Sequence, residues 1–147
     1  MLTLSGAPTG NITVRLTVSN VSVTLGASTS ATDSATVYGN VYGGSALGDV
    51  NDNANDNTTV TMNKALINGN LFGGAFGSGA AVTGRITVTV NGGRVNGSVF
   101  GGGKGNTATV TGNPQVTLSG NAHVTGNVYG GGDAAQVSGS TNVRVQD

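Results

Sequence analysis

The sequence predicts an all-β protein folded as a parallel β-solenoid (β-helix), with one coil for each repeat of roughly 29 residues. The main observation is a six-residue motif, Gly-Asn-Val-Tyr-Gly-Gly, which occurs four times in close variants. Its first glycines are Gly39, Gly69, Gly97 and Gly126, which lie 30, 28 and 29 residues apart. A repeat of this size cannot bury its apolar face alone, so neighbouring units must stack.

Two further observations give the secondary structure of each repeat. Apolar residues alternate with polar ones, which is the period of a half-buried strand. Glycine contributes 27 of the 147 residues, and each glycine destabilises a helix by about 1 kcal/mol relative to alanine. Helices are therefore excluded. Asn91-Gly92 is a hairpin-turn signal, but recurrent columns of equivalent residues favour parallel coils over a meander.

The repeats align in five apolar columns from residue 37 onward. The first two are Val37, Ile67, Val95 and Val124, then Val41, Leu71, Val99 and Val128. A looser third column is Ala54, Val82, Val110 and Val137. The last two are Val60, Val88, Val116 and Val143, then Met62, Val90, Leu118 and Val145. Each repeat thus carries three strand-like pieces separated by glycines, which predicts a three-sided coil. The handedness rule for parallel connections makes it right-handed.

Residues 1–36 are expected to be a diverged N-terminal coil or cap of the same domain. Apolar residues alternate with polar ones over residues 12–18 and 21–25, and Leu2-Thr3-Leu4-Ser5-Gly6 echoes Val116-Thr117-Leu118-Ser119-Gly120. Residues 1–147 then form one domain, with regular repeats over 37–147. About five coils spaced by ~4.8 Å predict a rod on the order of 24 Å long. Because both ends fall within the pattern, we expect an excised piece of a longer protein.

Composition narrows the class of function. Only 8% of residues are charged, the net charge is zero and no basic run occurs, so we expect no binding to nucleic acid. Without cysteine there is no disulfide or thiolate metal site. No apolar run approaches the ~20 residues of a membrane-spanning helix.

Two columns are candidate sites as well as candidate structural ladders. The aromatic column is Tyr42, Phe72, Phe100 and Tyr129, and the polar column is Asn40, Asn70, Ser98 and Asn127. Aromatic rings could form a strip for sugars, or stack to cover a corner and hold register. The amide side chains could contact a ligand, or they could hydrogen-bond from one coil to the next. In the second case Ser98 would leave a gap in the ladder. The structural role is favoured for both columns.

Asp49, Asn51 and Asn53 are a weak calcium candidate, because Asp-x-Asn-x-Asn is how a calcium loop opens. The match then fails. Ala54 stands where a glycine should turn the chain, and Val60 stands where a bidentate glutamate should be. A solvated loop rich in Asn and Asp is the favoured interpretation.

Threonine pairs on successive repeats suggest an ice-binding face as a minor alternative: Thr59 and Thr61, Thr87 and Thr89, then Thr117 and Ser119. Threonine is also a common exposed strand residue. Catalysis is not expected, because His123 is the only histidine, glutamate is absent and the basic residues are scattered. No catalytic residue and no cofactor are predicted.

The repeat resembles the glycine-rich repeats of large bacterial surface and secreted adhesin-like proteins. The resemblance rests on Val124-Thr125-Gly126-Asn127-Val128-Tyr129-Gly130-Gly131-Gly132, with Val-Thr-Gly and Val-Thr-Val pieces after it, and covers about residues 37–145. It implies an extracellular structural role, as a rigid shaft or a self-assembling fibre subunit. The expected partners are other copies through the solenoid ends, or flanking parts of a longer chain. A glycan-binding adhesin module is the alternative.

Overall fold

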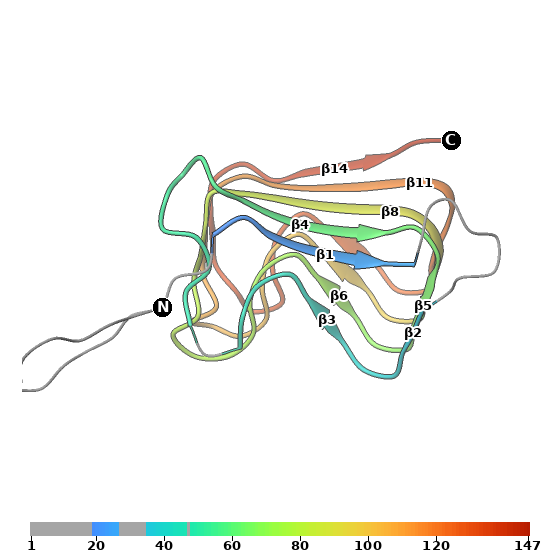
Figure 1. Ribbon diagram of the computed structural model, residues 1–147, viewed down its shortest axis with the longest axis horizontal. Helices are drawn as coiled ribbons and strands as arrows, with labels where there is room; N and C mark the ends of the chain where they lie inside the picture. The colour runs from blue at the N-terminus through green and yellow to red at the C-terminus, as the bar shows by residue number, and fades with distance from the viewer. Residues whose placement is uncertain (1–18, 27–34, 47) are drawn as a thin grey trace, which may run out of the picture.

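The computed structural model describes residues 19–26, 35–46 and 48–147. They form an all-β solenoid of about four turns, in which every strand pairs in parallel with its neighbours (Figure 1). The predicted fold class is confirmed. Its right-handed sense and three-sided cross-section stay predictions. About five coils were expected, and the patterns within residues 1–18 lie outside the described residues.

Each turn contributes a set of short strands. The first turn holds β1 (Val21–Leu25), β2 (Ala35–Val37) and β3 (Val41–Tyr42). The second holds β4 (Asn57–Met62), β5 (Ala65–Ile67), β6 (Leu71–Phe72) and β7 (Val82–Thr83). The third holds β8 (Arg85–Val95), β9 (Val99–Phe100) and β10 (Val110–Thr111). The fourth holds β11 (Pro114–Val124), β12 (Val128–Tyr129) and β13 (Val137–Ser138). A last strand, β14 (Asn142–Val145), follows.

The strands lie in three sheets. The long sheet runs β1-β4-β8-β11-β14, and β5 joins it by pairing with both β2 and β8. The aromatic sheet is β12-β9-β6-β3, and the short sheet is β13-β10-β7. Figure 1 shows the strands of the long sheet stacked with their arrows pointing the same way. The repeat period therefore fixes which residues become neighbours.

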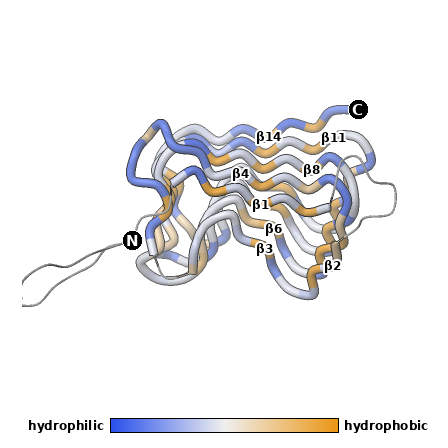
Figure 2. Tube along the Cα trace, viewed as in Figure 1, coloured by the Kyte–Doolittle hydropathy of each residue, from blue (hydrophilic) through white to orange (hydrophobic). Residues whose placement is uncertain are grey.

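The core is built from the predicted columns. Val60, Val88 and Val116 are paired in register, and so are Met62, Val90 and Leu118. Val60, Val88 and Val90 are fully buried. Figure 2 shows hydrophobic and hydrophilic residues alternating at matching places along the stacked strands. Burying one valine or leucine side chain stabilises a fold by about 1.5–3 kcal/mol, so the stacked columns are the main source of stability.

The third column was partly wrong. Val50, not Ala54, occupies it in the first turn, because Val50 follows β3, bridges to Val82 of the second turn and is 3% exposed, whereas Ala54 is exposed. The extra residues of the first turn follow the column instead of preceding it. Asn91-Gly92 also makes no hairpin. The pair lies inside β8, where Gly93 has φ +89° and the chain turns without reversing.

Candidate functional site

The aromatic column forms a continuous stack. The ring centroids of Tyr42 and Phe72 lie 4.9 Å apart, those of Phe72 and Phe100 4.7 Å, and those of Phe100 and Tyr129 4.9 Å. The rings are within 16° of parallel. This spacing is that of neighbouring strands, so the backbone sets it. Phe72 is fully buried, because both of its ring faces are covered by other rings.

A second layer borders this stack, and sequence reasoning did not identify it. Phe76, Lys104 and Asp133 are joined by successive parallel bridges. The Phe76 ring lies 5.3 Å from that of Tyr42, and the Lys104 ammonium lies 6.0 Å from the Phe72 centroid and 3.9 Å from an Asp133 carboxylate oxygen. These three residues are spaced by 28 and 29 residues, which is the repeat period and could have aligned them. Sequence reasoning missed the column because the residue types differ from turn to turn.

The polar column links each coil to the next through side chain and backbone. Asn40 Oδ1 accepts the Asn70 backbone N–H at 2.8 Å, and Asn70 Oδ1 accepts the Ser98 N–H at 2.7 Å. Ser98 Oγ then accepts the Asn127 N–H at 3.1 Å. The expected gap at Ser98 was therefore wrong, because the ladder needs only one acceptor oxygen and a hydroxyl supplies it.

Side-chain ladders of asparagine do occur, at positions that sequence reasoning missed. Asn91 Nδ2 donates to Asn63 Oδ1 at 2.8 Å, and Ser119 Oγ donates to Asn91 Oδ1 at 3.0 Å. Asn96 Nδ2 donates to Asn68 Oδ1 at 2.9 Å. Each pair is separated by 28 residues, so the repeat period was the available signal. These bonds also connect coil to coil.

The weak calcium candidates direct their oxygens to amide N–H groups. Asn51, which is 2% exposed and has φ +61°, accepts the Asn20 N–H at 2.9 Å and donates to Thr58 Oγ1 at 3.2 Å and to the Thr83 carbonyl at 3.0 Å. Asp49 Oδ1 accepts the Ala81 N–H, and Asn53 Oδ1 accepts the Asn55 N–H. Among the residues that the structure describes, no three His, Cys, Asp or Glu gather as metal ligands. These contacts anchor the loop.

The threonine face has a different register from the one predicted. Its columns on the long sheet are Ser22, Thr59, Thr87, Gln115 and Asn142, then Thr24, Thr61, Thr89, Thr117 and Arg144. Gln115, not Thr117, is therefore the partner of Thr87, and Thr117, not Ser119, is the partner of Thr89, because Pro114 aligns with Ile86 at the start of the strand. Four threonines in a row occupy the second column.

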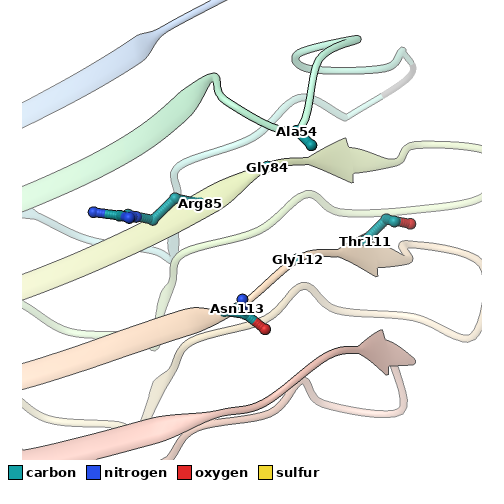
Figure 3. A pocket seen from close by; sticks show the side chains of 6 residues that line it. All are labelled: Ala54, Gly84, Arg85, Thr111, Gly112 and Asn113. Carbon is teal, nitrogen blue, oxygen red and sulfur yellow. The ribbon is translucent and has the colours of Figure 1, made fainter.

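A small hollow of about 180 Å³ lies where the short sheet meets the long sheet (Figure 3). It is lined by Ala54, Gly84, Arg85, Thr111, Gly112 and Asn113. The Arg85 and Thr111 side chains extend in opposite directions, so the polar groups do not converge on one point (Figure 3). Ligand pockets usually enclose about 300–1,000 Å³ around convergent groups, and this hollow has neither feature.

The C-terminal end of the solenoid exposes several apolar side chains. Five large hydrophobic side chains are exposed among the described residues, and three of them lie at this end: Tyr129 at 44%, Val143 at 43% and Val145 at 73%. A hollow of about 200 Å³ beside them is lined by Leu118, Gly120, Ala122 and Val145 among others. We call β12, β13, β14 and residues 118–124 the open C-terminal face. It continues the core columns and the aromatic stack.

Comparison with known proteins finds no matching family model, no matching curated protein and no matching solved structure. The described part of the chain also contains no helix long and apolar enough to cross a membrane.

Proposed function

We propose that this chain is a structural β-solenoid segment of an extracellular surface protein, acting as a rigid shaft or a self-assembling fibre subunit. The observation that carries the proposal is the parallel register of equivalent residues from β1 to β14, which shifts by one residue between Leu118 and Asn121 of β11. Each coil is held to the next by backbone bonds, stacked rings and polar ladders, so bending would break many contacts together. The adhesin-like sequence resemblance supports the extracellular setting.

The aromatic column supports a structural role more than a glycan-binding one. Sugar recognition by an aromatic side chain needs an uncovered ring face. Phe72 has neither face free, and Phe100 lies between Phe72 and Tyr129. In this column an adhesin module could therefore use only an end ring such as Tyr129, which has one stacked neighbour and is 44% exposed.

Ice binding is a second candidate, favoured by one observation. Thr24, Thr61, Thr89 and Thr117 form an outward column on regularly spaced strands. Its neighbouring column is interrupted by Gln115 and Asn142. Thermal hysteresis that is abolished in Thr89→Lys would support ice binding. Absence of thermal hysteresis in the wild type would rule out ice binding.

Negative-stain electron microscopy over a concentration series tests the main proposal. Straight unbranched fibres of constant width would support the fibre form, and dispersed short particles would support the shaft form. Amorphous aggregates would contradict both. The variant Val145→Lys places a charge on the open C-terminal face and should shorten fibres, since charged side chains protect strand edges. Gln115→Lys adds the same charge to the outer face of the long sheet and should leave fibres intact.

A further inference from the structure

We propose that the open C-terminal face binds the N-terminal segment of a second copy of this chain, continuing the solenoid in register across the joint. The inference rests on the proposed fibre function and specifies its partner surface. The face is exposed and apolar at Val143, Val145 and Tyr129. Each of these continues a column that is fully buried two coils earlier, at Val88, Val90 and Phe72.

The sequence before the described strands carries the partner motif. Thr9-Gly10-Asn11-Ile12 matches Thr125-Gly126-Asn127-Val128 in residue type and order. Gly10 stands 29 residues before Gly39, which is the period of the other motif glycines. Residues 8–12 thus have the sequence of one further aromatic-sheet coil, with Thr13 at the aromatic position.

The strand order leaves a place for such a segment. In the described residues the long sheet has β14 beyond β11, but nothing follows β12 in the aromatic sheet or β13 in the short sheet. Beyond the fourth turn, the described residues therefore hold only β14, with no further strand of the aromatic or short sheet. A second copy that supplied residues 8–18 there would extend the aromatic sheet beyond β12, and its β1 would then reach the edge of β14 that is unpaired in the described residues.

The backbone bonds of the interior coils define the contacts expected at this joint. Val99 N–H donates to the Asn127 carbonyl, and Gly101 N–H donates to the Tyr129 carbonyl, both at 2.9 Å. By the same pattern, Val128 and Gly130 would donate to Asn11 and Thr13 of the second copy. The Asn127 side chain would accept the Asn11 N–H, as Asn70 accepts that of Ser98.

The long sheet gives the same register. β1 and β14 each pair on one edge in the described residues, with β4 and β11 respectively. Their equivalent apolar positions are Val23 with Val143 and Leu25 with Val145. A head-to-tail contact of two different surfaces does not close on itself, so it repeats into a filament.

Disulfide trapping tests the joint, and the chain suits it because it has no cysteine. Thr125 occupies the position of Asn96 and Asn68, whose side chains touch across coils. Equivalent residues on adjacent strands lie ~4.8 Å apart, within the Cα separation of disulfides. The single variants Thr9→Cys and Thr125→Cys, one carrying a size tag, are mixed, oxidised and run on a non-reducing gel.

The joint predicts a mixed dimer at least about tenfold more abundant than either homodimer, because binding raises the effective thiol concentration. The control mixes Thr9→Cys with Asn96→Cys, which lies on an interior coil, and should give little dimer. A Thr125→Cys homodimer as the main product would show a tail-to-tail contact and overturn the inference. Fibres by microscopy without the mixed dimer would overturn the joint but keep the proposed function. If neither fibres nor the mixed dimer form, both the joint and the fibre form are overturned.

Discussion

The interior coils and the last coil have the same residue types in the same columns, but their burial differs. Val88 and Val90 are fully buried, whereas Val143 and Val145 are 43% and 73% exposed. Phe72 is fully buried, whereas Tyr129 at the end of the same stack is 44% exposed. The difference is the presence of a coil on both sides. Burial in this fold is thus contributed by the neighbouring coil, as expected for a nearly one-dimensional protein.

The largest effect should come from the aromatic stack. Phe72→Ala removes a ring that is covered on both faces and should lower the free energy of unfolding by about 4 kcal/mol. Tyr129→Ala, the matched change on the last coil, should lower it by about 1 kcal/mol because the ring has one stacked neighbour. Urea denaturation of both variants measures the pair. Equal losses would contradict the role of the neighbouring coil.

A glycine column gives the next largest contrast. A Cβ at Gly74 would lie 2.6 Å from the backbone nitrogen of Gly103, whereas a Cβ at Gly131 would meet nothing within 4 Å. Gly74→Ala should therefore destabilise the protein by about 3 kcal/mol, and Gly131→Ala by less than about 0.5 kcal/mol. Thermal unfolding at low concentration compares them. Equal losses of stability in Gly131→Ala and Gly74→Ala would contradict the effect of the neighbouring coil.

The loop at Asn51 should have an intermediate effect. Asn51→Ala leaves the Asn20 N–H, the Thr58 hydroxyl and the Thr83 carbonyl without this partner, so we expect a loss of about 2 kcal/mol. Asn53→Ala removes one exposed bond and should cost under about 0.5 kcal/mol. Chemical denaturation in the presence of a chelator distinguishes this anchoring role from a calcium role. A loss that appears only when calcium is present would favour the metal.

The polar ladder predicts a smaller effect with a built-in rescue. Ser98→Ala removes the acceptor of the Asn127 N–H and should destabilise by about 1 kcal/mol. Ser98→Asn restores the residue type of the column and should recover most of that loss. Asn127→Ala should change the stability of the dilute protein little. If Ser98→Asn is no better than Ser98→Ala, the acceptor is not what matters there.

The smallest effect should be at the exposed ion pair. Lys104 and Asp133 are 37% and 46% exposed, and surface pairs of this kind contribute little. Asp133→Asn should therefore alter the free energy of unfolding by under about 0.5 kcal/mol, with the difference vanishing in high salt. Denaturation curves at two salt concentrations check this. A larger, salt-independent change would point to a packing role for Asp133.

The sequence predicted most of the fold because its period is repeated. The spacing of Val60, Val88 and Val116 is enough to align them, since equal spacing in a stacked fold means spatial contact. Ala54 was misplaced because the first turn has extra residues, and one sequence does not show whether they lie before or after the column. Ser98 was misjudged because a ladder from side chain to backbone tolerates a change of side chain, which pattern matching counts as a break.

The candidate site was less predictable for a related reason. The open C-terminal face has no residue type of its own, because Val143 and Tyr129 look like every other member of their columns. Only their exposure distinguishes them, and exposure depends on what lies beyond the coil.

Amide hydrogen exchange over a concentration series tests the central claim most directly, that each coil is stabilised by its neighbours. In dilute solution, β8 and the first half of β11 should be strongly protected, and β14 should exchange fast because one of its edges is free. At concentrations where fibres form, β14 should become protected while β8 changes little. Protection of β14 equal to that of β8 in the dilute protein would contradict the account, and so would fast exchange of β14 within fibres.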